Sequence, residues 1–226
     1  MDSKVTGVNV LYEDNHIIVA IKPAGVLSQS DGSGAPDMLT ILKSYIKEKY
    51  EKPGEVYLGL VHRLDRPVSG VMVFARTSKA ASRLSEQIRL RKVDKIYRCV
   101  VNGVIKGEGR LENYISKDES RNVVTVSDNE KPGFKASYLD YKALASKDGL
   151  TLVEVKLGTG RSHQIRAQMA HSGHPLIGDQ KYGKRDDRTK DIALEAYKLS
   201  FEHPVKRVFI TFEAPIPSEF PWSLFA

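Results

Sequence analysis

Apolar and polar residues alternate with a period of two in several short segments of the chain, which is the pattern of β-strands with one buried face. The first two segments, residues 8–12 and 16–21, are separated by the turn formers Asp14 and Asn15, so they predict a β-hairpin. Further strands are expected at residues 57–61, 71–75, 96–101, 136–144, 150–157 and 208–212.

Three other segments follow the helical period and begin at residues that commonly cap helices. Apolar residues recur on one face after Asp37, and Thr77 or Ser78 can cap a second helix. Ser162 can cap a third helix, which would end at Gly173. Strands outnumber helices, and several neighbours are joined by short turns. These features predict an α+β fold with a largely antiparallel or mixed sheet.

The composition is that of a globular protein, with 41% hydrophobic and 28% charged residues in a chain of 226. No repeat or linker divides the sequence, so a single domain is expected over residues 1–226. The almost wholly polar segment 181–191 predicts an exposed loop.

The longest apolar runs are five residues, too short to span a bilayer, and the start lacks the pattern of a signal peptide. Cys99 is the only cysteine, which excludes an internal disulfide and agrees with a reducing compartment. A cytoplasmic protein without membrane attachment is therefore expected. The formal net charge of +7 favours a polyanionic partner such as nucleic acid.

The loop His62-Arg63-Leu64-Asp65-Arg66-Pro67 places an imidazole, two guanidiniums and a carboxylate between two apolar segments. Nearby positive charge favours the ionised form of an aspartate, so Asp65 could act as a nucleophile. The alternative is that Asp65 only holds the loop through hydrogen bonds and salt bridges, and composition leaves both interpretations open.

A second cluster, Gly158-Thr159-Gly160-Arg161-Ser162-His163-Gln164-Ile165-Arg166, covers a strand end, a turn and the start of a helix. Backbone donors and the guanidinium of Arg161 could bind a phosphate or a carboxylate. The glycines do not match a phosphate-binding loop of the Gly-Lys-Ser type. A helix cap followed by a surface arginine explains the same residues.

Basic residues surround Tyr97, and they suit phosphate contact combined with base stacking. Solvated helix charges explain the basic residues as well, and Tyr97 could simply pack in a sheet. The stripe consists of Arg89, Arg91, Lys92, Lys95 and Arg98. The spacings of His163, His171 and His174 are poor for zinc, so no metal site is expected.

Together these clusters resemble the RluA-type pseudouridine synthases, and the resemblance covers most of the chain. It implies a mixed, mostly antiparallel central sheet flanked by helices and loops. The matching motifs are Lys22-Pro23-Ala24-Gly25-Val26, His62 to Arg66 with Ser69-Gly70, Lys95-Ile96-Tyr97, Gly160 to Arg166, Gly173-His174-Pro175, Gly178-Asp179 and Tyr182-Gly183.

The resemblance also implies a role for individual residues. Asp65 corresponds to the catalytic aspartate, Tyr97 to the tyrosine that stacks on the base, and Arg161 to the arginine that pairs with the aspartate. Arg63 corresponds to a residue that helps to displace the target nucleotide, and Leu199 to an apolar residue of the pocket.

A wider set of residues is expected to contact RNA or to line the pocket. The expected RNA contacts are His62, Arg63, Arg66, Arg91, Lys92, Lys95, His163, Gln164 and Arg166, with Leu64 and Leu199 in the pocket. The chain departs from the family at Val68, where Thr is frequent, and at Glu195, where His is frequent. The first family motif begins at about residue 22, so a preceding small RNA-binding domain is not expected.

The implied activity is that of an isomerase that needs neither cofactor nor metal. Pseudouridine formation breaks the bond between uracil N1 and ribose C1′, turns the base and rejoins it through C5. Ionised Asp65 would either attack C1′ or take a proton from C2′, and the sequence does not choose between these routes. The target uridine, in a ribosomal or transfer RNA stem-loop, would be flipped out of its stack by a monomeric enzyme.

Two other classes of function compete with this interpretation. A noncatalytic RNA-binding module would explain the charge and Tyr97, but not the carboxylate in its loop. A glycoside hydrolase or nucleosidase would need a second carboxylate. Asp179 is the only candidate, and its glycine-rich surroundings favour a role in a turn.

Overall fold

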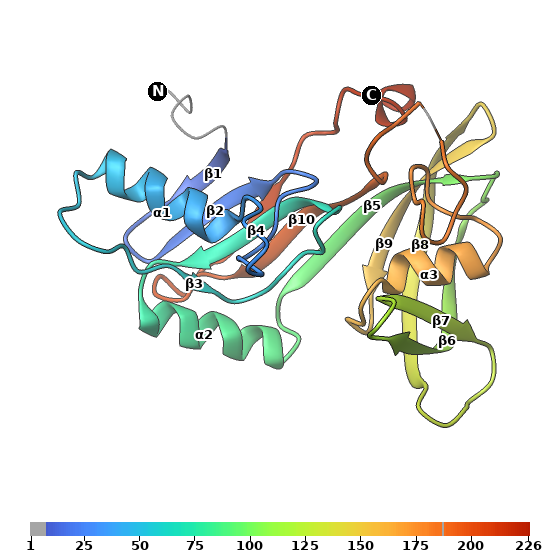
Figure 1. The fold of residues 1–226 in the computed structure, drawn as a ribbon, viewed down its shortest axis with the longest axis horizontal. Helices are drawn as coiled ribbons and strands as arrows, with labels where there is room; N and C mark the ends of the chain where they lie inside the picture. Colours follow the sequence, from blue (N-terminus) through green and yellow to red (C-terminus); the bar gives the residue numbers. More distant parts are fainter. Residues whose placement is uncertain (1–7, 187) are drawn as a thin grey trace. The chain divides into compact units, whose positions relative to one another are not determined.

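The computed structural model describes residues 8–186 and 188–226, and the chain forms two compact units (Figure 1). The first unit contains the chain up to Lys95 together with Ala196–Ala214, and the second contains Ile96–Glu195 and Pro215–Ala226. The chain passes between the units within strands β5 (Asp94–Asn102) and β10 (Leu194–Glu202), and again after Ala214. That the two units together act as one catalytic domain stays a prediction.

The first unit is built on a sheet in which β1, β2, β4 and β10 are neighbours in that order, while β3 pairs with β4 and β11 pairs with β10. The pairings β1–β2, β2–β4, β3–β4 and β10–β11 are all antiparallel. Apart from β10, its strands are β1 (Asn9–Glu13), β2 (Ile17–Lys22), β3 (Gly59–Leu60), β4 (Ser69–Ala75) and β11 (Phe209–Glu213).

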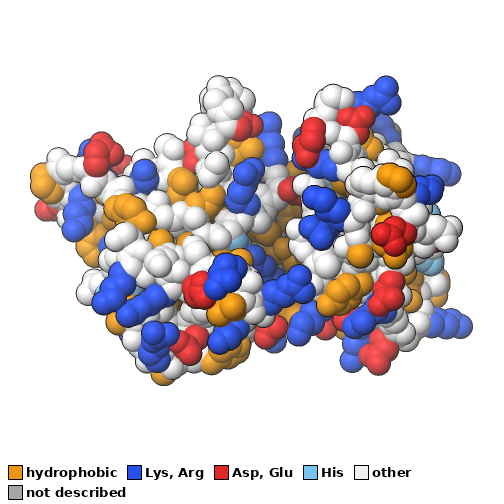
Figure 2. Space-filling view, turned by 90° about the horizontal axis from the view of Figure 1, so that it is seen from below, with side chains coloured by type: hydrophobic (Ala, Val, Ile, Leu, Met, Phe, Trp, Pro, Cys, Tyr) orange, Lys and Arg blue, Asp and Glu red, His pale blue; other side chains and the backbone are white. Residues whose placement is uncertain are grey.

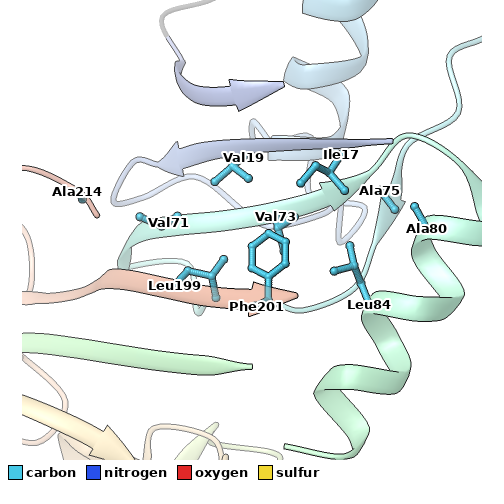
Figure 3. Close-up of a cluster of buried hydrophobic side chains, with 10 residues drawn as sticks. All are labelled: Ile17, Val19, Val71, Val73, Ala75, Ala80, Leu84, Leu199, Phe201 and Ala214. Carbon is cyan, nitrogen blue, oxygen red and sulfur yellow. The ribbon is translucent and has the colours of Figure 1, made fainter. Parts of the chain in front are cut away.

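Two helices belong to this unit, and each begins at a capping side chain. Asp37 accepts a hydrogen bond from the backbone N–H of Thr40 at the start of α1 (Met38–Lys49). Thr77 caps α2 (Ser78–Arg89) in the same way. The apolar core lies between α2 and the sheet, where Leu84 and Phe201 are fully buried among valines and isoleucine of β2 and β4 (Figure 3).

The second unit is built on antiparallel strands in the order β5, β9, β8, β6 and β7. Its helix α3 (Gln164–His171) contacts β6 and β7, and a short 3-10 helix (Trp222–Leu224) lies near the C-terminus. The remaining strands are β6 (Glu108–Asp118), β7 (Val123–Ser127), β8 (Lys135–Lys147) and β9 (Leu150–Leu157). The predicted α+β fold with mostly antiparallel strands is confirmed.

Some local predictions were wrong. The strand expected at 57–61 is only two residues long, and β6, β7 and β10 were not expected. The helix expected after Ser162 is capped at His163, whose backbone is left-handed (φ 50°) and whose side chain makes no capping hydrogen bond. The described part of the segment 181–191 has neither helix nor strand, as expected, and position 187 lies outside the described residues.

Over residues 8–186 and 188–226, none of the helices combines the length and the apolar character needed to cross a membrane.

Candidate active site

The loop between β3 and β4 presents its side chains alternately to the interior of the first unit and to solvent. His62 and Leu64 are buried, whereas Arg63 and Asp65 are exposed. An extended backbone gives this alternation because successive side chains point to opposite sides. The candidate catalytic carboxylate therefore projects from a segment whose alternate side chains anchor it in the core.

The residue before Asp65 is held by a serine from another part of the chain. The Ser28 hydroxyl donates to the backbone carbonyl of Leu64 (2.8 Å) and accepts from the N–H of the same residue (3.1 Å). His62 lies two residues before Leu64, and its Nε2 accepts a hydrogen bond from the Val73 N–H of β4 (3.1 Å). Both contacts are buried, so water does not compete for these groups.

The residue after Asp65 is held by the segment that begins at Lys22. The buried ammonium of Lys22 donates to the carbonyls of Pro23 (3.0 Å), Val26 (2.7 Å) and Arg66 (3.0 Å). The N–H of Gly25 also donates to the Arg66 carbonyl (2.9 Å), while Nε of Arg66 donates to the Gly25 carbonyl (3.0 Å). Gly25 has a φ of 80°, which glycine adopts without strain. This arrangement gives the first family motif a physical role as a support for the loop.

Burial shifts the charges around this loop. It lowers the pKa of Lys22 to about 8, and the nearby Asp65 acts in the opposite direction. Burial also lowers the pKa of Lys95 to about 8, and that of His62 well below its usual value, with Lys95 adding to the effect on His62. Because Nε2 of His62 accepts a hydrogen bond, its proton lies on Nδ1, which is buried without a partner among the described residues.

In the second unit, Gln164 organises the loop that carries Arg161. Its side-chain oxygen accepts from the Thr159 hydroxyl (2.9 Å) and from the Arg161 N–H (3.1 Å), and its nitrogen donates to the Tyr138 carbonyl (2.9 Å). Gln164 is buried and Arg161 is exposed. Gln164 thus shapes the turn, and Arg161 presents its guanidinium to solvent.

His163 turns the chain into α3, and the hydroxyl of Tyr182 fixes its position. Nδ1 of His163 lies 2.8 Å from that hydroxyl, which also accepts from the Val124 N–H of β7 (2.7 Å). A non-glycine residue with a φ of 50° needs such surrounding support. The Tyr182-Gly183 motif therefore braces the start of α3.

Arg166 and Asp179 form a buried ion pair with two hydrogen bonds, of 2.8 and 2.7 Å. Although burial opposes it, Arg166 holds the pKa of Asp179 below its usual value. Asp179 also accepts from the N–H groups of Lys181 and Tyr182, which is the turn role that its sequence context favours. This pairing uses the guanidinium of Arg166 inside the unit, and its predicted contact with RNA stays a prediction.

The predicted basic stripe divides in the structure. Arg91 and Lys92 are exposed after α2, while Arg89 forms an ion pair with Glu86. Arg98 is buried against Glu195, its Nε 2.7 Å from the carboxylate, so it does not belong to a solvated stripe. Burial raises the pKa of Glu195, and Arg98 counteracts that rise. Glu195, where His is frequent in the family, is thus the ion-pair partner of the buried Arg98.

The sequence-predicted residues fall into two groups. Tyr97 on β5 is buried and opposite Val155 of β9, and it belongs to the second unit. Leu199 lies in the first unit's core. The first unit holds His62, Arg63, Leu64, Asp65, Arg66, Arg91, Lys92, Lys95 and Leu199, and the second holds Tyr97, Arg161, His163, Gln164 and Arg166. The pairing of Asp65 with Arg161 joins residues of different units and stays a prediction.

The sequence did not point to Ser28 or to the bracing role of Tyr182. Ser28 is a short polar residue after two apolar ones, and a partner 36 positions away leaves no local signal.

In the described parts of the chain, no cluster of three or more His, Cys, Asp or Glu side chains is placed to hold a metal ion.

Comparison with known proteins decides the family. The model of the RNA pseudouridylate synthase family matches residues 16–171, a range that includes Asp65, Tyr97 and Arg161. The chain belongs to the RNA pseudouridylate synthase family. The resemblance found in the sequence motifs is therefore confirmed.

Several members of the RNA pseudouridylate synthase family are similar along nearly the whole chain. The ribosomal large subunit pseudouridine synthase D of Neisseria meningitidis serogroup A is 36% identical over 224 residues, which cover 93% of this chain and 59% of that protein. The uncharacterized RNA pseudouridine synthase YhcT of Bacillus subtilis is 34% identical over 215 residues, covering 93% of this chain and 69% of that protein. The chain thus spans less than two thirds of the Neisseria relative.

The fold of the family is also found among solved structures. Human RNA pseudouridylate synthase domain containing 4 superposes with a TM-score of 0.79 at 22% sequence identity, covering 96% of this chain and 91% of that one. Human RNA pseudouridylate synthase domain containing 1 superposes with a TM-score of 0.75 at 23% identity. At this level of identity the likeness shows the fold alone.

Proposed function

We propose that this protein is an RNA pseudouridine synthase, an isomerase that converts a uridine in structured RNA to pseudouridine with Asp65 acting at the ribose. The proposal rests on the family match over residues 16–171. It is supported by the loop between β3 and β4, in which Leu64 is buried and Asp65 is exposed. The residues on both sides of Asp65 are held by hydrogen bonds, from the Ser28 hydroxyl to the Leu64 carbonyl and from the Lys22 ammonium to the Arg66 carbonyl. Such preorganisation is what positioning a reacting group requires.

In the proposed reaction, the Asp65 carboxylate either attacks C1′ and displaces uracil N1, or removes the proton from C2′ so that the N1–C1′ bond breaks and a glycal forms. When C5 of the turned uracil bonds to C1′, the first route releases the carboxylate from C1′ and the second returns the proton to C2′. In both routes C5 then loses its proton and N1 gains one. Arg161 would pair with the carboxylate. The ring of Tyr97 would stack on the uracil while it turns, which is worth about 1–3 kcal/mol per base. Arg63 would help to displace the nucleotide from its stack, because a stacked base cannot enter a pocket.

The proposed substrate is ribosomal RNA, since the Neisseria relative is named for the ribosomal large subunit. A transfer RNA stem-loop is the second substrate to test. The exposed Arg63, Arg66, Arg91 and Lys92 would contact phosphates. We further propose that the protein acts as a monomer in the cytoplasm, where its buried free thiol at Cys99 fits a reducing compartment.

The test is Asp65→Asn, assayed on in vitro transcribed large-subunit ribosomal RNA that carries tritium at C5 of uridine. Joining C5 to the sugar displaces that tritium, so its release measures the reaction. We expect roughly a 1000-fold or greater loss of rate, with unchanged circular dichroism and RNA affinity. Asp31→Asn, at another exposed loop aspartate of the same unit, is the matched control. Turnover by folded Asp65→Asn at the wild-type rate would disprove the assignment.

A further inference from the structure

Asp65 lies between two peptide groups, and each of their carbonyls accepts one hydrogen bond. The carbonyl of Leu64, in the peptide group before Asp65, accepts from the Ser28 hydroxyl (2.8 Å). The carbonyl of Asp65 itself, in the peptide group after it, accepts from the Val68 N–H (3.0 Å). These two bonds restrain the peptide planes on either side of the Asp65 α-carbon, and those planes set the direction in which its Cα–Cβ bond leaves the backbone.

The two bonds differ in how they respond to substitution. The Val68 contact uses only the backbone N–H, so any residue other than proline at position 68 can make it. The Ser28 contact depends on one hydroxyl that serves both the carbonyl and the N–H of Leu64. Ser28 is 4% exposed and Leu64 7% exposed, so water does not readily replace the hydroxyl.

Ser28 is itself held in place by the start of α1. The neighbouring Leu27 forms an isolated parallel bridge with Asp37, donating to the Pro36 carbonyl (3.0 Å) and accepting from the Met38 N–H (2.8 Å). The hydroxyl also lies 3.8 Å from the sulfur of Met72, which is fully buried in β4. The hydroxyl is therefore a fixed point, supported from a helix and a strand, against which the Asp65 loop is placed.

We propose that Ser28 is a positioning residue for the reaction, setting the orientation of the Asp65 carboxylate through the Leu64–Asp65 peptide group. This inference rests on the proposed function. The Leu64 side chain is buried independently of the hydroxyl, so we expect Ser28→Ala to fold while the peptide group before Asp65 is held less rigidly. A small displacement of a reacting group slows the chemical step far more than it weakens substrate binding.

The experiment compares Ser28→Ala and Ser28→Cys with Ser200→Ala. Ser200 is equally buried in the first unit, at 4% exposure, and its hydroxyl contacts the Thr211 hydroxyl (2.9 Å) instead of a backbone group of the Asp65 loop. Turnover is measured by tritium release from the same C5-labelled ribosomal RNA. Thermal unfolding, RNA affinity and hydrogen exchange of the Leu64 amide are measured alongside.

For Ser28→Ala we expect kcat to fall roughly 10- to 100-fold, with KM within about twofold of wild type, and faster exchange of the Leu64 amide. Ser28→Cys keeps the shape of serine and a weaker hydrogen-bonding group, so its kcat should lie between those of wild type and Ser28→Ala. If Ser28→Ala fails to fold, the comparison is made with Ser28→Cys. Ser200→Ala should keep its kcat.

Three results would overturn the inference. One is a kcat of folded Ser28→Ala equal to that of Ser200→Ala, and another is a loss confined to KM. The third is a wild-type protein that releases no tritium, which would remove the proposed function as well. An active wild type with an unaffected Ser28→Ala variant would overturn the positioning role alone.

Discussion

The ammonium of Lys22 lies in the interior of the first unit, where three backbone carbonyls accept its hydrogen bonds. Loss of solvation destabilises the charged form and lowers the pKa of Lys22 to about 8. The ammonium in turn fixes the Arg66 carbonyl next to Asp65. A charge in this position links the stability of the Asp65 loop to pH.

Lys22 should make the protein more stable as the pH rises above 8. Its pKa is about 8 when folded and 10.5 as the ordinary value, so between these pH values the unfolded chain binds more protons. The free energy of unfolding of wild type, relative to Lys22→Met, should rise through that window by up to about 3 kcal/mol. Below about pH 7, where Lys22 is protonated in both the folded and the unfolded chain, the difference should be constant.

Urea unfolding at pH 7.5, 9 and 10 measures this difference. Lys95, whose pKa is lowered to a similar value, titrates in both proteins and cancels in the comparison. Lys79→Met removes one exposed charge of α2 and is the control for general charge effects. A difference between wild type and Lys22→Met that falls with pH would contradict the prediction.

At the scale of elements, the connection from β9 to α3 depends on close packing against β8. A β-carbon added at Gly158 would lie 1.8 Å from a ring carbon of Tyr138, whereas one added at Gly160 would meet nothing within 4 Å. The guanidinium of Arg110 lies over the same Tyr138 ring, with 4.9 Å between its central carbon and the ring centre. In the turn that carries Arg161, close packing thus excludes a side chain at Gly158, whereas Gly160 has room for one.

Gly158→Ala should therefore be destabilising and Gly160→Ala should not. Because the Tyr138 ring or the backbone has to move, we expect Gly158→Ala to lower the free energy of unfolding by about 1–3 kcal/mol. Gly160→Ala should stay within about 0.5 kcal/mol of wild type. Thermal and urea unfolding of the two variants provide the comparison, and equal stability of both would show that the turn adapts.

At the scale of the whole molecule, the formal net charge is +7. On the face that Figure 2 shows, Lys and Arg side chains are interspersed with Asp and Glu and do not form one continuous patch. Some basic residues are already neutralised, such as Arg89 by Glu86 and Arg98 by Glu195. The charge available to the proposed RNA substrate therefore depends on exposed cations without an acidic partner.

Arg91 and Lys92 should contribute directly to RNA affinity and to its salt dependence. If both contact single-stranded phosphates, the double substitution to Gln should lower the slope of log affinity against log salt by about 1.4, or 0.7 per contact. Arg89→Gln removes a cation that is already paired and should change the slope less. Filter binding over a range of KCl concentrations measures the slopes, and identical slopes would remove Arg91 and Lys92 from the interface.

Local signals in the sequence were sufficient where a short-range interaction fixes an element. Asp14 closes the β1–β2 turn by accepting the N–H groups of His16 and Ile17, and Asp37 and Thr77 cap their helices. The strand β6 was missed because it is rich in charged residues and has no buried run. Such strands form because neighbouring strands pair with them along their length.

The sequence by itself determined the family, the candidate chemistry and most of the elements, because residue identities, spacings and capping signals are local properties of the chain. Only the tertiary structure decided which partner each buried polar side chain has. Ser28 meets Leu64 across 36 positions, Lys22 meets Arg66 across 44, and Arg98 meets Glu195 across 97. Hydrogen bonds between such distant residues exist only after the strands have paired, since it is the fold that brings their donors and acceptors within reach and excludes water from them.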